Sequence, residues 1–436
     1  MKIVIVGGGA GGLELATKIG RKLGKSQQAE VVLIDRNQTH LWKPLLHKVA
    51  TGALDAEVEG VSYRAHGHNN GYTFKLGELT GVDPERKCIQ LKPAVNAEGE
   101  EFLPAREEAY DYLVLAIGSV ANDFGIPGVS DHCVLLDRLA HANRLQQRLL
   151  EKFIGLNREL SKGAAERMLR VAIIGGGATG VELSAELYKA REELVKYGMK
   201  HVTPEHMQVT LIEAGPRLVP QLDNNISQRA EQELTRLGVT VKTNTQVKRA
   251  DKGGFVTSDD GFIESDIMVW AAGVKAPDFL PQMGHFEFNR ANQILVKPTL
   301  QTSRFDDVFA MGDCAGLQIE ASDGQLRWVP ARAQSAHQMA DTVGHNLLRL
   351  IKSQPLVEFT YKDMGSLVSL GEYNAFGRLM GGLARGGLSV RGRIARWLYI
   401  SLYRMHQSAI YGWPRTVLIT INDRFNHWLR PRLKLR

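Results

Sequence analysis

The sequence has few cysteines, no long apolar run and no low-complexity tract. Its three cysteines are not spaced as a metal site or a redox pair: Cys88, Cys133 and Cys314. We therefore expect neither a disulfide framework nor a metal site, and packing is the default role of each thiol. No run of about 18 apolar residues occurs, so no transmembrane helix is expected. The first residues begin a strand at once, so no signal peptide is expected and the protein should stay on the cytoplasmic side.

Acidic residues are scarce at the C-terminal end. Residues 378–436 contain twelve lysines and arginines and one acid, Asp423, a balance of +11 in a chain whose net charge is +7. The remaining residues therefore sum to −4. The basic character belongs to this tail, and it indicates a partner rather than a fold.

Glycine, by contrast, is abundant, and its first cluster follows the N-terminal strand. The apolar run KIVIV leads into GGGAGG and then into a helical stretch, LELATKIGRKL. Gly7 permits a tight turn, Gly9 lets the backbone approach a pyrophosphate, and Gly12 lets the helix pack closely on the strand. The helix start offers N–H groups to phosphates. Asp35 ends the next strand, where it can accept hydrogen bonds from a ribose. A dinucleotide-binding fold is predicted, and a plain strand–turn–helix joint is the alternative.

The same arrangement occurs a second time. LRVAII leads into GGGATG and a helix, with glycines at Gly175, Gly177 and Gly180. The following strand, QVTLIEAG, contains Glu213 near its end. An acid there favours NAD, because the 2′-phosphate of NADP would meet a negative charge.

Three further strand-and-turn segments are expected to complete the two folds. Residues 110–119 and 265–274 both run from an apolar strand into a glycine turn, at Gly118 and Gly273. A third strand ends in Gly312-Asp313, where Rossmann-type flavoproteins present an aspartate to the ribityl chain of the flavin. If the first fold closes with residues after about 300, the second fold is inserted between its halves.

Together these motifs resemble the two-dinucleotide flavoprotein reductases, which include glutathione reductases, ferredoxin reductases and type II NADH:quinone oxidoreductases. The resemblance covers residues 1 to about 370. It implies an α/β protein with two Rossmann-type folds. FAD is expected on the first fold, through Gly7, Gly9, Gly12, Asp35, Gly118, Gly312 and Asp313. NADH is expected on the second, through Gly175, Gly177, Gly180, Glu213 and Gly273. The expected ranges are 1–125 and 295–375 for FAD, 126–167 for a connector, 168–294 for NADH and 376–436 for a C-terminal membrane-anchoring region.

The electron acceptor is indicated by one absence and one motif. Residues 35–52 contain no cysteine, which excludes the dithiol of the disulfide reductases. Residues 333–338, AQSAHQ, match the AQxAxQ signature of the type II NADH:quinone oxidoreductases. The resemblance implies that Ala333, Gln334 and Gln338 line a quinone pocket, where neutral amides can donate to quinone carbonyls. Glutamines that face solvent on the first turn of a helix are the alternative.

Glu182, two residues after the second glycine motif, has two interpretations. By resemblance it is a catalytic residue, which transfers a proton to the quinone or positions the nicotinamide. It is alternatively a first-turn acid that the helix dipole favours. Both interpretations stay open.

The tail predicts an amphipathic helix over residues 394–410. A helical wheel places Ile394, Leu398, Leu402, Met405 and Ala409 on one face and Arg396, Tyr399, Tyr403 and Gln407 on the other. Further on, the chain has an apolar stretch (416–421), Trp428 and the basic end RPRLKLR. Cations interleaved with aromatic residues suit an anionic lipid surface. A dimerising or core-packed helix and a nucleic-acid-binding tail are the alternatives.

The resemblance as a whole implies a bacterial type II NADH:quinone oxidoreductase. Hydride would pass from nicotinamide C4 to flavin N5, and two electrons would pass to a membrane quinone without proton pumping. The expected location is the cytoplasmic side of the inner membrane, with no nucleic-acid partner and a possible homodimer. A sulfide:quinone oxidoreductase is the nearest rival, but it requires cysteines beside the flavin, with Cys133 and Cys314 as candidates. The other rival is a signalling flavoprotein whose tail binds nucleic acid.

Overall fold

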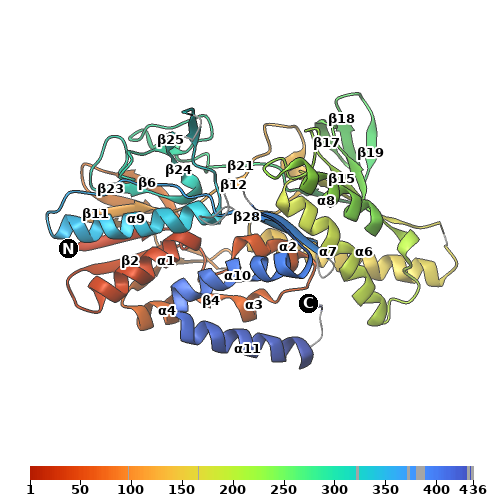
Figure 1. Cartoon of the computed structure of the whole chain (residues 1–436), viewed down its shortest axis with the longest axis horizontal. Helices are drawn as coiled ribbons and strands as arrows, with labels where there is room; N and C mark the ends of the chain where they lie inside the picture. The colour runs from red at the N-terminus through yellow and green to blue at the C-terminus, as the bar shows by residue number, and fades with distance from the viewer. Residues whose placement is uncertain are drawn as a thin grey trace. The chain divides into compact units, whose positions relative to one another are not determined.

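The structure of the chain, a computed structural model, describes residues 1–96, 98–164, 166–320, 324–370, 374–379, 388–429 and 433. The chain forms two compact units (Figure 1). Unit 1 comprises Met1–Trp42, Gly60–Val120 and Val274–Lys362, and unit 2 comprises Lys43–Glu59, Ala121–Gly273 and Asp363–Arg436. Each unit contains a five-stranded parallel sheet. These units are defined by packing, and the ranges predicted above for each ligand stay a prediction.

The sheet of unit 1 has the strand order β23-β11-β1-β2-β5, and all its neighbouring strands are parallel. Its strands are β1 (Lys2–Val6), β2 (Glu30–Asp35), β5 (Thr73–Leu76), β11 (Tyr112–Leu115) and β23 (Val308–Ala310). The side chains of β1 and β2 are mostly apolar and buried on both faces, as expected of a parallel sheet covered by helices. Helix α1 (Ala10–Ile19) packs on β1 and β2, and α9 (Ala333–Ile351) lies along α1 (Figure 1).

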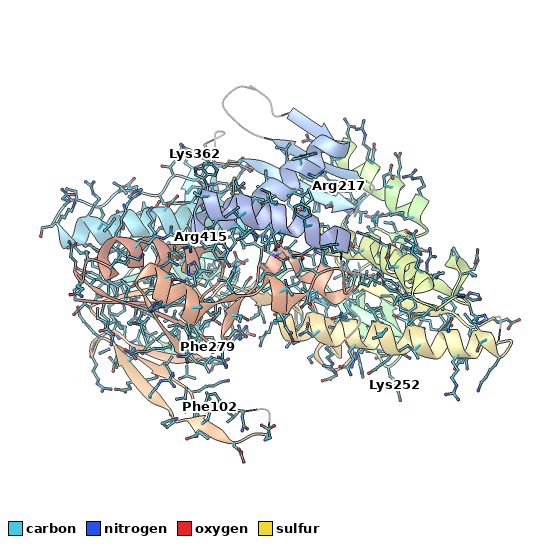
Figure 2. The ribbon with its side chains drawn as sticks, turned by 90° about the horizontal axis from the view of Figure 1, so that it is seen from below. Phe102, Arg217, Lys252, Phe279, Lys362 and Arg415 are labelled. Atoms are coloured by element: carbon cyan, nitrogen blue, oxygen red, sulfur yellow. The ribbon has the colours of Figure 1, made fainter. Side chains whose placement is uncertain are left out.

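Smaller elements complete unit 1. Helix α1 continues into a π-helical turn, η1 (Gly20–Gly24). The others are β3 (Thr39–His40), β4 (Val61–Ser62), α4 (Tyr63–Asn70), β6 (Leu79–Asp83), β7 (Cys88–Leu91), β8 (Ala94–Val95), β9 (Glu101–Leu103), β10 (Arg106–Ala109), β21 (Val274–Lys275), η4 (Pro281–Met283), β22 (Ile294–Leu295), η5 (Gly312–Cys314), β24 (Ala315–Gly316), β25 (Gln318–Glu320) and β26 (Leu326–Trp328). Strands β8 and β9 form an exposed hairpin, on which Phe102 is labelled in Figure 2.

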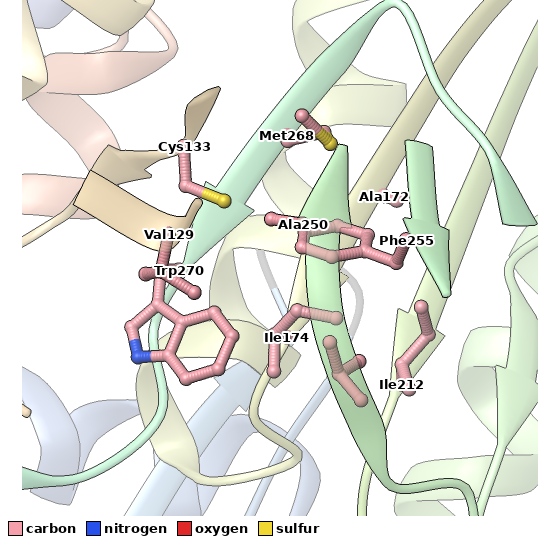
Figure 3. Packing of buried hydrophobic residues seen from close by; sticks show 10 residues of the cluster. Val129, Cys133, Ala172, Ile174, Ile212, Ala250, Phe255, Met268 and Trp270 are labelled. Atoms are coloured by element: carbon pink, nitrogen blue, oxygen red, sulfur yellow. The ribbon is translucent and has the colours of Figure 1, made fainter. Parts of the chain in front are cut away.

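The sheet of unit 2 repeats this order with its own strands, β13-β20-β14-β15-β16. They are β13 (Val134–Leu135), β14 (Leu169–Ile174), β15 (Met207–Ile212), β16 (Thr240–Lys242) and β20 (Ile267–Trp270). One face of this sheet packs on Phe255 and its neighbours in a buried cluster that includes Trp270 and Cys133 (Figure 3). The indole N–H of Trp270 donates a hydrogen bond to the carbonyl oxygen of Asn122 at 2.8 Å, which satisfies its polar atom inside the core.

The remaining elements of unit 2 are mostly helical. They are η2 (Lys43–Leu45), α2 (Leu46–Ala50), α3 (Ala56–Glu59), α5 (Val129–His132), α6 (Leu139–Ser161), α7 (Ala178–Lys196), η3 (Pro204–His206), α8 (Asn224–Leu237), β17 (Val247–Asp251), β18 (Gly254–Thr257) and β19 (Phe262–Glu264). Strand β12 (Val120–Ala121) lies where the chain passes from unit 1 to unit 2.

The C-terminal part of unit 2 is an antiparallel sheet followed by two helices. The strands are β27 (Gly365–Leu370), β28 (Asn374–Leu379) and β29 (Leu388–Arg391), and the helices are α10 (Gly392–Tyr411) and α11 (Trp413–Leu429). Helix α10 packs on this sheet and on α11. The predicted amphipathic helix is therefore present, and a second helix follows it. Within the described ranges, no helix is both long enough and apolar enough to cross a membrane.

The two segments that looked alike in the sequence occupy matching places in the two sheets. Residues 112–115 form β11, which pairs with β1, and residues 267–270 form β20, which pairs with β14. Both predictions are confirmed. Strand β23, which follows all five strands of the second sheet in the sequence, pairs with β11 in the first sheet. The carboxyl ends of these parallel strands place the glycine loops and the later glycine turns at the same edge of each sheet.

Candidate functional site

The two glycine loops have the same backbone geometry. Gly7 and Gly175 have positive φ angles of +103° and +111°, which glycine adopts without strain. A Cβ on Gly12 would lie 1.9 Å from the carbonyl oxygen of Gly7, and a Cβ on Gly180 would lie 2.0 Å from that of Gly175. Both loops therefore require glycine at the turn and again where the helix crosses the strand.

The middle glycine of each loop faces open space. A Cβ added to Gly9 or to Gly177 would have no heavy atom within 4 Å. These residues are the N-caps of α1 and α7, and no side chain caps either helix. Neither helix has an acid in its first turn. Open space beside helix N–H groups that no side chain caps fits the pyrophosphate of a dinucleotide.

An acid at the end of the second strand braces each loop. An oxygen of Asp35 accepts a hydrogen bond from the N–H of Gly8 at 2.6 Å, and an oxygen of Glu213 accepts one from Gly176 at 2.6 Å. A carboxylate can accept about four hydrogen bonds, so both retain capacity for ribose hydroxyls. The acids therefore shape the loops, in addition to the ribose contact predicted for Asp35 and the preference for NAD predicted from Glu213.

The later turns of unit 1 meet because their strands are neighbours. The hydroxyl of Ser119, next to Gly118, donates to a carboxylate oxygen of Asp313 at 2.7 Å. Gly118 and Gly312 both have positive φ, at +72° and +71°. A Cβ on Gly118 would meet nothing within 4 Å. The structure thus brings together three of the residues predicted to contact the flavin.

The corresponding turn of unit 2 lies against its own glycine loop. Gly273 has a φ of +65°, and a Cβ there would lie 2.5 Å from the ring of Phe124. A Cβ on Gly175 would lie 2.8 Å from the backbone of Ala271, two residues before Gly273. In unit 1, Gly7 lies against the backbone of Ala116 in the same way.

The predicted quinone residues begin helix α9 in unit 1. Ala333 is the first residue of the helix, and Gln334 and Gln338 are one turn apart. Both amide nitrogens donate to the carbonyl oxygen of Lys362, at 3.0 and 2.8 Å, and the N–H of Lys362 donates to Gln338 at 2.9 Å. Lys362, labelled in Figure 2, is the last residue of unit 1. The two side chains therefore hold the backbone just before the chain enters β27.

His337, between these glutamines, pairs with a buried acid on α1. Its Nδ1 is hydrogen bonded to Glu14, whose side chain is buried, and its Nε2 lies 4.0 Å from Asp341. The hydrogen bond to Glu14 raises the pKa of His337 above its usual range. This pair fixes the start of α9 against α1.

Glu182 lies in a buried cluster of unit 2. Its side chain is 6% exposed, and His47 Nδ1 lies 3.4 Å from one carboxyl oxygen. The other oxygen accepts a hydrogen bond from the N–H of Ser369, on β27, at 3.0 Å. Tyr399, on α10, is hydrogen bonded to the same carboxyl group, and Lys48 contributes a nearby positive charge. Four separate elements, α2, α7, β27 and α10, therefore converge on this carboxyl group.

Burial decides the protonation of this cluster. Desolvation raises the pKa of Glu182 to about 8, so the carboxyl group is mostly protonated at neutral pH. Desolvation also lowers the pKa of His47 to about 3, so the imidazole is neutral. The first turn of α7 contains no acid, because Glu182 lies beyond it. The alternative interpretation of Glu182, a first-turn acid that the helix dipole favours, is therefore wrong.

The comparisons with known proteins agree with these motifs. The family model of the pyridine nucleotide-disulphide oxidoreductases matches residues 1–340. A type II NADH:quinone oxidoreductase from Haemophilus influenzae is 47% identical over 99% of both chains.

The chain belongs to the type II NADH:quinone oxidoreductases.

More distant relatives of this family agree. The enzyme of the same name from Staphylococcus aureus is 29% identical over 87% of this chain and 90% of its own. The structure of NDH2 from Plasmodium falciparum in complex with NADH matches with a TM-score of 0.80 and 21% identity, over 99% of both chains. The sulfide:quinone oxidoreductase of Aquifex aeolicus matches with a TM-score of 0.71 and 18% identity, over 94% of this chain and 92% of that one. These two structural matches show the fold alone.

Membership of the type II family also bears on the sulfide:quinone rival. All three cysteines are buried and free. Burial raises the pKa of Cys133 to about 12 and that of Cys314 to about 11. A buried thiol with a raised pKa is a poor nucleophile toward sulfur. Both side chains therefore behave as packing residues, and Cys133 lies within the core cluster of Figure 3.

Sequence reasoning missed several residues that support the sites of this type II enzyme. Tyr63 donates a hydrogen bond to the carbonyl oxygen of Gly8 at 2.6 Å, and His40 Nδ1 contacts the same oxygen at 2.8 Å. His47 and Tyr399 were not singled out as partners of Glu182. The sequence offered one signal, because Glu14 and Glu182 occupy the same place after the two glycine motifs.

Proposed function

We propose that this chain oxidises NADH and reduces a membrane quinone. Bound FAD would supply the redox chemistry, by accepting the hydride of NADH and giving two electrons to the quinone. In sum, NADH, a quinone and a proton give NAD⁺ and the quinol. The chain must therefore bind two dinucleotides and deliver a proton from water.

The observation that carries this proposal is the presence of two equivalent dinucleotide cradles in one chain. Each has an open middle glycine, an uncapped helix start and a bracing acid. Asp313 and Ser119 beside the first cradle support its assignment to FAD. Glu213 at the second supports NADH over NADPH, because a carboxylate repels a 2′-phosphate.

Anaerobic stopped-flow spectroscopy of the purified holoprotein tests the proposal. NADH should bleach the yellow flavin band rapidly, NADPH should bleach it slowly, and a short-chain quinone should restore it. If NADH bleaches the flavin and quinone fails to restore it, the acceptor is wrong. If the purified protein contains no flavin, the assignment of the first cradle is wrong.

Glu182 is proposed to be the immediate proton donor for quinone reduction. A carboxyl group with a pKa of about 8 holds a proton at neutral pH and can release it, which a general acid requires. Neutral His47 and the hydroxyl of Tyr399 keep it oriented without a competing cation at contact distance. Glu182→Gln should leave flavin bleaching by NADH unchanged and slow quinone reduction by roughly a hundredfold or more. Slower bleaching at saturating NADH would instead assign Glu182 to the nicotinamide.

Ala333, Gln334 and Gln338 are proposed to contact the quinone head group. In the structure, both amides are hydrogen bonded to Lys362, so a quinone carbonyl would have to exchange with that backbone group. Gln338→Leu should raise the KM for quinone about tenfold, the value of one good hydrogen bond. An unchanged KM would leave the glutamines with the single task of holding Lys362.

The two C-terminal helices are proposed to dock on an anionic membrane surface. Leu402 and Met405, from the predicted apolar face of α10, are exposed, while Gln407 from the other face is buried. Leu398 and Ala409 are half-buried, as are Tyr399 and Tyr403. The side chains of Ile394, Arg396 and Trp428, and the end residues 430–432 and 434–436, lie outside the described residues.

Helix α11 extends the exposed apolar face. Trp413 is 70% exposed, Leu418 66% and Phe425 61%, and Val417, Ile421 and Leu429 are also exposed. These positions fall on one side of a helical wheel, and the buried Thr416 falls on the other. Large apolar side chains gathered in this way mark an interaction surface. The excess of basic residues in the tail favours anionic lipid as its partner.

Vesicles of phosphatidylglycerol and phosphatidylethanolamine test this surface. The double variant Leu418→Glu with Phe425→Glu should lose co-sedimentation with vesicles and keep its activity with a short-chain quinone. Phe262→Glu, at an exposed position on β19, is the matched control and should still bind vesicles. If the double variant instead changes from dimer to monomer and still binds vesicles, the face is a dimer interface. The cytoplasmic face of a bacterial inner membrane is the location that this proposal implies.

A further inference from the structure

Helix α7 carries a line of ionisable side chains that begins at Glu182. The positions spaced at three or four residues from it are Glu186, Lys189, Glu193 and Lys196. At 100° per residue they fall within about 40° of Glu182 on either side, so they form one stripe along the helix. We call this line the α7 stripe. The inference drawn from this stripe rests on the function proposed above, because it concerns the delivery of a proton to Glu182.

The second residue of the α7 stripe is buried and incompletely paired. Glu186 is 4% exposed, and among the described residues its Oε2 has no hydrogen-bond partner. A buried carboxyl oxygen without a partner costs free energy, so the position of Glu186 calls for an explanation. Glu186 lies one turn from Glu182, and its charge raises the pKa of Glu182. The negative charge of one buried carboxylate favours the protonated form of a neighbouring acid, so the two groups interact electrostatically.

Other elements complete the surroundings of the two carboxyl groups. Tyr399, from α10, is hydrogen bonded to Glu182, and both carboxyl groups act on its hydroxyl. From α2, His47 lies 3.4 Å from Glu182, and Lys48 adds a positive charge. The histidine is held neutral, so it does not fix either carboxylate as an ion pair.

The far end of the α7 stripe reaches solvent. Lys189 is half-buried, and Glu193 is buried and accepts a hydrogen bond from Lys196 at 2.8 Å. The side chain of Lys196 is 62% exposed. Along one face of a single helix, the stripe therefore runs from a buried acid to the surface.

We propose that the α7 stripe conducts protons from solvent to Glu182, with Glu186 as the group that reprotonates it. In each turnover Glu182 loses a proton as quinol forms, Glu186 gives its proton to Glu182, and Glu186 is recharged from the exposed end. The redox electrons come from NADH and end on the quinone, so the stripe itself is neither oxidised nor reduced. Glu186 acts through Glu182 and is a positioning and relay residue.

The variant Glu186→Gln tests the relay, because glutamine keeps the shape and cannot carry the proton. Flavin bleaching by NADH should be unchanged, and quinone-driven restoration of the flavin should slow by roughly tenfold or more. The solvent deuterium isotope effect on that step should rise. Glu192→Gln is the matched control, because Glu192 lies on α7, is exposed and is off the stripe.

The outcomes separate the relay from the proposed function. If the wild-type protein fails to reduce quinone, the proposed function is wrong and the relay falls with it. If the wild type reduces quinone and Glu186→Gln matches Glu192→Gln in rate and isotope effect, the relay alone is wrong. Glu186→Asp should restore part of the rate. A Glu186→Gln protein that has lost flavin or melts much earlier is replaced in the test by Lys189→Met, which should also slow only the quinone step.

Discussion

The two copies of the dinucleotide motif have a glutamate at the same position but surround it with different electrostatic environments. Glu14 on α1 and Glu182 on α7 each follow the last motif glycine by two residues, and each is buried. Each faces the Nδ1 atom of a histidine, His337 in unit 1 and His47 in unit 2. The pKa of His337 is raised, and that of His47 is lowered to about 3.

Burial of the histidine explains the difference. The side chain of His337 is 37% exposed, so water and Glu14 stabilise its charge, whereas that of His47 is 2% exposed. The next turn reinforces the contrast, because α1 continues with Lys18 where α7 has Glu186. The same motif thus yields an ion pair in one unit and a protonated carboxyl group beside a neutral histidine in the other. Local sequence sets the position of the acid, and desolvation sets its chemistry.

The largest effects should come from the glycines that the two copies share. Gly180→Ala would place a methyl group 2.0 Å from the carbonyl oxygen of Gly175, which backbone cannot accommodate without moving. We expect a cost of about 3 kcal/mol, which lowers the melting temperature by roughly 3 °C. Gly177→Ala meets open space, so it should fold normally and raise the KM for NADH about ten- to hundredfold.

Calorimetry and steady-state kinetics on the four alanine variants check the equivalence of the loops. Gly12→Ala should destabilise the protein as Gly180→Ala does, and Gly9→Ala should fold but lose flavin. If Gly177→Ala also loses flavin, or if Gly9→Ala changes only the KM for NADH, then each dinucleotide has been assigned to the wrong loop.

The second prediction concerns the neutral cluster of unit 2. The pKa of Glu182 rises from 4.5 to about 8 on folding, so its stabilising contribution is complete below pH 4.5 and is lost as the pH rises to 8. Glu182→Gln removes this loss. Relative to the wild type, the free energy of unfolding of the variant should therefore increase by a few kcal/mol across that pH range. Melting temperatures measured from pH 5 to 9 test this. A constant difference between the two proteins would mean that Glu182 is ionised in the folded state.

The third prediction separates the two bracing acids. Glu213→Gln removes the negative charge that meets a 2′-phosphate, so the preference for NADH over NADPH should fall about tenfold. The ratio of kcat/KM for the two nucleotides measures it. Asp35→Asn in unit 1 should leave that ratio unchanged, and a change there would show that the acids do not serve separate nucleotides.

Much of the fold could be predicted because the pattern itself has a physical cause. Buried apolar strands followed by glycine turns predicted the two folds, and the strands expected within residues 110–119 and 265–274 are present as Tyr112–Leu115 and Ile267–Trp270. The amphipathic pattern of 394–410 predicted a helix, which the structure contains as α10. Periodicity along the chain carries this kind of information.

The cluster around Glu182 could not be predicted, because its partners come from distant parts of the chain. His47, Ser369 and Tyr399 lie on three other elements, and no spacing links them to Glu182. Its protonation depends on burial, which sequence alone does not give. The same limit affected Tyr399, which was placed on the polar face of its helix and instead packs into the protein. The hydrogen bonds from Gln334 and Gln338 to Lys362 could also not be predicted from the sequence, because the residues are more than 20 positions apart.

The smallest effect should come from the ion pair of unit 1. Because the folded-state pKa of His337 is raised, its contribution to stability is complete below pH 6.5 and is lost as the pH rises through that raised value. The histidine is partly exposed, so the pair should contribute no more than about 1 kcal/mol. His337→Gln should therefore melt slightly below the wild type at pH 5.5 and match it at alkaline pH. Glu14→Gln removes the same ion pair, so it should not melt above the wild type at either pH. If His337→Gln is destabilised equally at both pH values, the side chain acts by packing, and the contrast between the two histidines is one of shape and not of charge.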